Sequence, residues 1–245
     1  VHVTSAMLNY MKYDVGTMGN HDVETGHAVY DRWVKQCAFP VLGANIVDNK
    51  TGEPYLTPYK IIERKGVKIA VLGMITPAIP SWLPEQLWNG LHFEDMEDCA
   101  RKWVKIIKEK ENPDVLIGLF HAGPEGNKLD NVVENGSGDV AKNVLGFDVV
   151  FMGHDHVRRC EKIVNVAGDS VLLVDPANAA RYVSDVTVKV TKAGGKLVRK
   201  SVEGAWADVS RYAADEDFMR EFAGQYQATV DFVSRKIGRI EETIT

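Results

Sequence analysis

The chain has 245 residues, of which 45% are hydrophobic and 26% are charged, and this is enough apolar material to bury a sizeable core. Its 29 Lys and Arg residues against 34 Asp and Glu residues give a net charge of −5, which excludes the strong positive field that binding to a nucleic-acid backbone requires. No stretch approaches the roughly 18 apolar residues of a membrane-spanning helix. We therefore expect a folded chain with no nucleic-acid polymer as partner and no membrane span.

The three cysteines, Cys37, Cys99 and Cys160, are an odd number and lack the spacing of a metal site. They cannot form a complete disulfide framework, and free cysteine is among the residue types most often buried. We expect them to pack as free thiols, and they leave the cellular compartment open.

The first fifty residues alternate apolar segments with polar turns. The pattern predicts a helix over Thr4–Lys12 and a short strand over Tyr13–Met18 that runs into the turn Gly19-Asn20-His21-Asp22. A second helix is expected after Thr25, and apolar Val41–Val47 predicts one further strand.

The middle of the chain begins with a predicted hairpin, Tyr59–Glu63 with Val67–Ile75. The second member is almost continuously apolar, which is typical of a strand buried on both faces. The segment Thr76–Leu91 holds several prolines and two tryptophans, so we expect an irregular loop whose aromatic residues pack on the core. The segment Glu94–Glu111 has the periodicity of an amphipathic helix.

Two further apolar runs, Asp114–Phe120 and Phe147–Gly153, are each followed directly by a histidine, His121 and His154. Open α/β sheets place their ligands at the carboxyl ends of strands, so this coincidence is the first functional signal. The Gly-rich and Asn-rich segment 122–138 between them predicts a loop over the same edge. The remaining expected elements are a short helix over Asp139–Leu145, strands over Val171–Val174, Tyr182–Val190 and Leu197–Val202, and a long closing helix over Asp215–Ile237. This pattern favours a layered α/β domain.

Four of the seven histidines follow predicted strands in short polar turns: His21, His121, His154 and His156. Imidazole is the commonest metal ligand, and a His-x-His pair can place both rings on one ion or share them between two ions. The sequence contains no Gly-x-Ser-x-Gly elbow, no phosphate-binding loop with Lys and Ser or Thr, and no Gly-x-Gly-x-x-Gly motif. The residues therefore favour a metal site.

The ordered set Gly19-Asn20-His21-Asp22, His121 after its strand, and Gly153-His154-Asp155-His156 resembles three motif blocks of the calcineurin-like metallophosphoesterases. The stretches Tyr13-Asp14, Tyr55–Ile75 and Arg235–Gly238 are similar to the branch that holds 5′-nucleotidases and 2′,3′-cyclic-nucleotide 2′-phosphodiesterases. The resemblance implies a four-layer α/β/β/α sandwich. It also implies hydrolysis of nucleotide phosphoesters, a small-molecule nucleotide substrate, and a periplasmic, secreted or cell-surface location.

The same resemblance implies roles for individual residues. Asn20, His121 and His154 would bind one divalent ion and His156 a second, with Zn, Mn, Fe and Co all compatible with these ligands. His21 would act in catalysis, stabilising the transition state or protonating the leaving oxygen, and Glu24 would orient it. The family usually has Asp at the Glu24 position, and an exposed acid at the start of a helix is an equally good interpretation of this residue.

Two blocks of the family are absent from this sequence: Asp-x-His and the Gly-Asp that carries a metal-bridging aspartate. We expect them upstream of Val1, so that one metal site is incomplete here and the chain is inactive without them. Residues 1–237 would form the metallophosphoesterase domain without its first strand. Residues 238–245 would begin a linker to a C-terminal nucleotide-binding domain.

Two alternatives stay open at this point. The chain is also compatible with a catalytically incomplete scaffold or binding fragment of such an enzyme. His-x-His also occurs in metal-dependent amidohydrolases, although the mixed strands after Val157 fit eight βα units poorly. The nucleobase, the metal and the oligomeric state cannot be read from the sequence.

Overall fold

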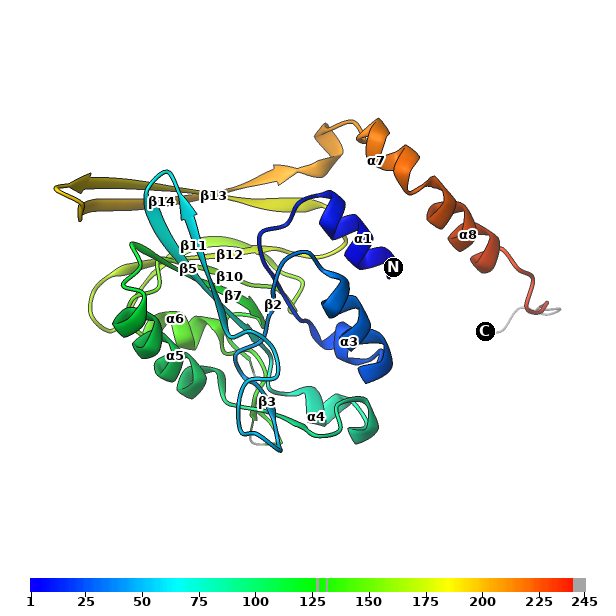
Figure 1. The fold of residues 1–245 in the computed structure, drawn as a ribbon, viewed down its shortest axis with the longest axis horizontal. Coiled ribbons are helices and arrows are strands. Elements are labelled where there is room, and N and C mark those ends of the chain that lie inside the picture. Colours follow the sequence, from blue (N-terminus) through cyan, green and yellow to red (C-terminus); the bar gives the residue numbers. More distant parts are fainter. Residues whose placement is uncertain (127, 131, 240–245) are drawn as a thin grey trace, which may run out of the picture.

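The computed structural model describes residues 1–126, 128–130 and 132–239. Its centre is a sheet (Figure 1) of six strands in the order β11-β12-β10-β7-β5-β4. These strands are β4 (Tyr59–Arg64), β5 (Val67–Ile75), β7 (Val115–His121), β10 (Val149–Phe151), β11 (Arg158–Val164) and β12 (Ser170–Pro176). The inner strands β12, β10, β7 and β5 are parallel, and β11 and β4 pair antiparallel at the two edges. The predicted hairpin of β4 and β5 is confirmed, whereas the open mixed sheet contradicts the (β/α)₈ barrel of the amidohydrolase alternative.

Helices α5 (Met96–Lys110) and α6 (Ser137–Asn143) cover one face of this sheet (Figure 1). The Asp95 side chain begins α5 by accepting hydrogen bonds from the N–H groups of Glu97 and Asp98. The apolar stripe of α5 then packs on the inner strands in one large buried cluster. This burial holds the parallel strands in register.

A second β layer lies over the opposite face. The hairpin of β13 (Tyr182–Ala193) and β14 (Lys196–Asp208) packs Val186, Val188 and Val202 against β10 and β12. Beside it, β1 (Gly16–Thr17) pairs in parallel with β2 (Val41–Leu42), and helices α1 (Val3–Tyr10) and α3 (His27–Gln36) enclose a second core around them. This confirms the predicted layered α/β class.

The shorter elements join these layers. They are α2 (Asn20–Val23), β3 (Ile46–Asp48), α4 (Ile79–Trp82), a 3₁₀ turn (Glu85–Leu87), β6 (Leu91–Phe93), β8 (Lys128–Leu129), β9 (Val132–Val133), a second 3₁₀ turn (Val209–Arg211), α7 (Glu216–Glu221) and α8 (Ala223–Val233). Several of them lie in segments that the sequence predicted as loops, and the sequence did not predict β11. Cys37, Cys99 and Cys160 are free thiols, as expected. Within the described ranges, no helix is both long and apolar enough to span a membrane.

The predicted single strand over Val41–Val47 is wrong, because the chain turns between β2 and β3. A Cβ at Gly43 would lie 2.8 Å from Ile46 Cδ1, so a larger residue at this turn would require the Ile46 side chain to shift. The buried Asn45 side chain then donates to the carbonyl of Ile75 (2.7 Å) and accepts from its N–H (3.0 Å). The Asn45 side chain thus gives the backbone of Ile75, at the end of β5, the two hydrogen bonds that a neighbouring strand would otherwise provide.

The predicted closing helix over Asp215–Ile237 is also wrong. The segment forms two helices that separate at Phe222, where the rings of Phe218 and Phe222 contact Tyr10 on α1 (centroids 5.6 and 5.7 Å). Beyond this contact α8 leads away from the layers, and Phe232 and Val233 are exposed (Figure 1). The predicted linker begins at Gly238, and its residues 240–245 lie outside the described part of the chain.

We predict that Asn45→Ala lowers the free energy of unfolding by about 3 kcal/mol, because it leaves the buried N–H and C=O of Ile75 without a partner. Urea unfolding followed by circular dichroism measures this loss. Asn178→Ala, at an exposed position, is the matched control. Equal stability of the two variants would contradict the role of Asn45.

Candidate functional site

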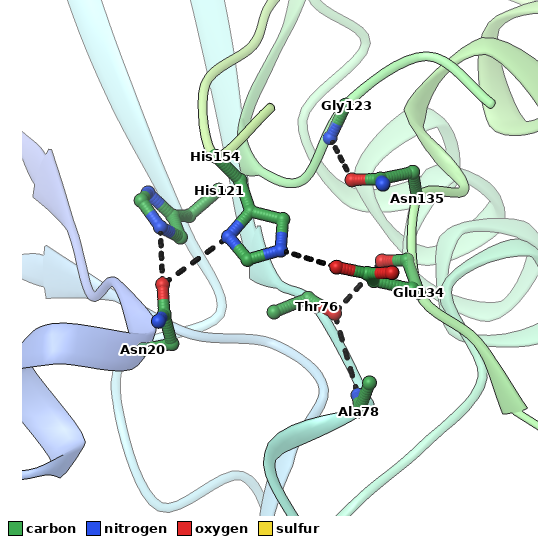
Figure 2. Close-up of polar contacts among 8 residues, drawn as sticks. All are labelled: Asn20, Thr76, Ala78, His121, Gly123, Glu134, Asn135 and His154. Atoms are coloured by element: carbon green, nitrogen blue, oxygen red, sulfur yellow. Dashed lines mark hydrogen bonds and ion pairs between the residues drawn. The ribbon is translucent and has the colours of Figure 1, made fainter. Parts of the chain in front are cut away.

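The parallel strands bring three predicted site residues together at one edge of the sheet (Figure 2). His121 is the last residue of β7, His154 follows β10, and Asn20 begins α2. The amide oxygen Oδ1 of Asn20 lies 2.8 Å from Nε2 of His121 and 3.2 Å from Nδ1 of His154. The centroids of the two imidazole rings are 5.3 Å apart. Two histidines that lie 101 and 134 positions from Asn20 in the chain thus approach one amide oxygen.

Local backbone features allow this convergence. A Cβ at Gly19 would lie 3.0–3.2 Å from the ring atoms of His121, so glycine lets the turn approach this ring. The Gly19 N–H donates to the Asp22 carboxylate (2.8 Å), which stabilises the start of α2. His154 and His156 have φ angles of 83° and 60°, a region that non-glycine residues adopt uncommonly. Such strained positions are typical of functional sites.

The electrostatics of the site favour neutral histidine. Burial, together with the charges of His154, His21 and His156, lowers the pKa of His121 to about 4. At neutral pH this ring therefore carries no net charge, and one of its nitrogens has a free lone pair. A neutral imidazole is the form that binds a metal ion.

Glu134 is a further residue of this site that the sequence analysis missed. Its Oε1 lies 3.0 Å from Nε2 of His154, on the side of the ring opposite Asn20 (Figure 2). The sequence placed Glu134 in a loop over the correct edge of the sheet, and an acidic residue in such a loop was the available signal. Trp82 of α4 packs beside His154, with ring centroids 5.4 Å apart.

The donor atoms fit a divalent cation. Ligand atoms bound to one ion at about 2.1 Å lie about 3 Å apart, which matches the distances from Asn20 Oδ1 to the two histidine nitrogens. Because a carboxylate only accepts hydrogen bonds, its contact with Glu134 places the proton of a neutral His154 on Nε2. Nδ1 and the Asn20 oxygen then face each other as two acceptors, an arrangement that a cation between them stabilises.

The other predicted residues lie close by but outside this cluster. The exposed His21 follows Asn20 on α2, and its Nδ1 lies 2.8 Å from Oε1 of Glu24, so the predicted pair is formed. His156 is exposed, and its side chain makes no hydrogen bond within the described residues. Among those residues, no group of three or more His, Cys, Asp or Glu side chains is arranged to hold a metal. The candidate set is therefore two histidines and an amide, and the second ion assigned to His156 stays a prediction.

Asp175, near the end of β12, is fully buried close to the turn that carries His154. One carboxylate oxygen accepts the N–H of Ala177 (2.8 Å), and the other has no partner among the described residues. Burial and the negative charge of Asp155 raise the pKa of Asp175 to about 6, against the opposing effect of the Ala177 hydrogen bond. Asp175 therefore takes up a proton in the folded chain well above the ordinary range of Asp.

Comparison with known proteins shows which family the chain resembles. Residues 4–158 match the family described as calcineurin-like phosphoesterase. The trifunctional nucleotide phosphoesterase protein YfkN of Bacillus subtilis is 27% identical over 265 aligned positions, which cover 99% of this chain and 18% of that protein. A 2′,3′-cyclic-nucleotide 2′-phosphodiesterase/3′-nucleotidase of Haemophilus influenzae is 34% identical over 158 positions, which cover 61% of this chain and 24% of that protein. Other relatives carry the name 5′-nucleotidase.

The fold agrees with these matches. The crystal structure of calcineurin-like phosphoesterase YfkN from Bacillus subtilis superposes with a TM-score of 0.81 at 24% identity, covering 96% of this chain and 76% of that one. The chain spans less than half the length of the curated relatives it matches first.

We predict that Gly19→Ala weakens divalent-metal binding without unfolding the chain, because the added Cβ displaces the His121 ring from Asn20. Isothermal titration with Mn²⁺ measures the affinity, and circular dichroism checks the fold. Gly224→Ala is the matched control, since a Cβ at that glycine meets no atom within 4 Å. An unchanged Mn²⁺ affinity in Gly19→Ala would contradict the idea that the close approach of Gly19 to the His121 ring supports metal binding.

Asp175→Asn tests the buried carboxyl. The folded pKa of about 6 is above the unfolded value, so the wild-type chain loses stability as pH rises from about 4 through 6, by roughly 3 kcal/mol at most. Asn does not ionise and avoids this loss. We therefore expect urea unfolding between pH 4 and 7 to show that the free energy of unfolding of the variant increases relative to that of the wild type as pH rises. A difference between the two free energies that does not change with pH would contradict the raised pKa.

Proposed function

Because the chain belongs to the calcineurin-like phosphoesterase family, we propose that it provides the metal-binding core of a hydrolase that cleaves nucleotide phosphoesters. The observation that carries this proposal is the convergence of His121 and His154 on Asn20 Oδ1 at the carboxyl edge of the sheet. The sheet edge is also where α/β folds bind their ligands. The names of the relatives favour 5′-nucleotides or 2′,3′-cyclic nucleotides as the substrate class.

Asn20, His121 and His154 would hold one divalent ion, and His156 would contribute to a second. A pair of such ions supplies positive charge to the phosphoryl oxygens and activates water for attack on phosphorus. The amide oxygen of Asn20 is neutral, so it adds no repulsion toward an anionic substrate. The low pKa of His121 keeps its ring neutral and able to bind metal at physiological pH.

His21 would act on the substrate itself. Its Nδ1 lies 2.8 Å from Oε1 of Glu24, a contact that would orient the ring and leave Nε2 for the substrate. A protonated His21 can donate to the leaving oxygen while the ester bond breaks. The high exposure of this side chain, 75%, is compatible with a group that meets a substrate from solvent.

The proposed domain covers residues 1–237, with a linker from residue 238 toward a C-terminal nucleotide-binding domain. Hydrolysis by this domain would also need an aspartate that bridges two metals, which the family resemblance assigns to a Gly-Asp block and not to any of the site residues above. A periplasmic, secreted or cell-surface location stays a prediction from the family resemblance.

We predict different effects for substitutions of the proposed metal ligands and of the proposed catalytic acid. Each variant is tested in the chain alone and in the chain joined to an upstream segment that carries the Asp-x-His and Gly-Asp blocks. His121→Ala and His154→Ala remove proposed ligands, so Mn²⁺ or Zn²⁺ affinity falls by more than about 100-fold. His21→Ala keeps its metal, while turnover of bis(p-nitrophenyl) phosphate by the extended chain falls by about 100-fold or more.

Metal content by mass spectrometry and hydrolysis rates together check these roles. Equal metal content in all three variants would contradict the ligand assignment. Absence of metal and of activity in the extended wild-type chain would favour the scaffold alternative.

A further inference from the structure

The contact between Glu134 and His154 is the starting point of this inference. Oε1 of Glu134 lies 3.0 Å from Nε2 of His154, and the two side chains are only 25% and 12% exposed. Little water competes for this hydrogen bond, which therefore constrains the ring more than a surface ion pair would. The other ring nitrogen, Nδ1, is the atom that faces Asn20.

The backbone of Glu134 is itself held on both sides (Figure 2). The hydroxyl of Thr76, a fully buried residue directly after β5, donates to the Glu134 carbonyl (2.7 Å) and accepts the N–H of Ala78 (3.3 Å). The next residue, Asn135, accepts the N–H of Gly123 with its side-chain oxygen (2.6 Å). The backbone that carries the Glu134 carboxylate is thus hydrogen-bonded to the segments that follow β5 and β7, and β7 ends in His121.

The ring of His154 is restrained from a second direction by Trp82. The two rings lie at an interplanar angle of 35° with centroids 5.4 Å apart. Glu134 contacts one edge of the imidazole and Trp82 packs beside the ring in a tilted arrangement, and together they restrict its rotation. A ring held in this way keeps Nδ1 directed at the shared oxygen.

We infer that Glu134 is a positioning residue that holds His154 as the tautomer with its proton on Nε2 and its lone pair on Nδ1. This inference rests on the proposed function, because it assigns Nδ1 as the metal-binding atom. The carboxylate also increases the electron density of the ring and thereby strengthens Nδ1 as a ligand. Carboxylate–histidine contacts of this kind typically change metal affinity by about 10- to 100-fold.

The test compares Glu134→Gln with Glu125→Gln. Both substitutions remove one negative charge from the same loop, but the exposed Glu125 side chain makes no hydrogen bond within the described residues. Mn²⁺ and Zn²⁺ affinities are measured by isothermal titration. Two-bond ¹H–¹⁵N spectra of the metal-free chain at pH 8 report which nitrogen of His154 carries the proton, a readout that a merely structural role does not move.

We expect the wild-type spectrum to show His154 protonated on Nε2, and Glu134→Gln to lose this single tautomer and bind metal about 10- to 100-fold more weakly. Glu125→Gln is expected to match the wild type in both measurements. Wild-type affinity together with a wild-type spectrum in Glu134→Gln would overturn the inference.

The two proposals fail in different ways. A wild-type chain that binds neither ion contradicts the proposed ligands, while its spectrum still decides the role of Glu134. If Glu134→Gln does not fold, the wild-type spectrum alone decides, because a proton on Nδ1 of His154 would overturn the inference.

Discussion

The site depends on one constraint, the parallel direction of the inner strands. Because β5, β7 and β10 point the same way, their carboxyl ends meet at one edge, and the residues that follow them converge there. Thr76, His121 and His154 occupy three such positions, and each contributes a polar atom to the same network. The burial of the sheet between α5 and α6 on one face and the β13-β14 hairpin on the other maintains this alignment.

The chemistry of the cluster follows from the charges of its members. Its inner atoms are a neutral amide oxygen and two imidazole nitrogens, whereas the carboxylate of Glu134 lies behind His154. Neutral inner ligands would leave a bound cation strongly electropositive toward a phosphate, and the outer carboxylate would preserve affinity for the cation. With the His154 proton on Nε2, its Nδ1 and the Asn20 oxygen would be two acceptors 3.2 Å apart, an arrangement that a cation between them would stabilise. The cluster is therefore better suited to a cation than to a role in packing alone.

Elements whose chemistry and periodicity are local could be predicted from the sequence. The apolar runs of β5 and β7, the helix of α5 and the Gly-Asn-His turn are all visible as patterns of neighbouring residues. Elements whose local structure depends on a long-range contact could not be predicted from the sequence. Asn45 interrupts a predicted strand because its partner is Ile75, and the predicted C-terminal helix divides at a contact with Tyr10. Neither partner can be identified from the neighbours of Asn45 or Phe222 in the chain.

The same distinction applies to the site. The sequence by itself determined which residues are of metal-binding type and that two of them lie at the carboxyl ends of buried strands, because residue type and hydrophobic periodicity are local properties. Only the tertiary structure decided that Asn20 Oδ1 meets both histidines, that Glu134 takes the remaining nitrogen of His154, and that His156 stays outside this cluster. Those outcomes depend on strand order and on the paths of the connecting loops, which bring together residues as far apart as 134 positions.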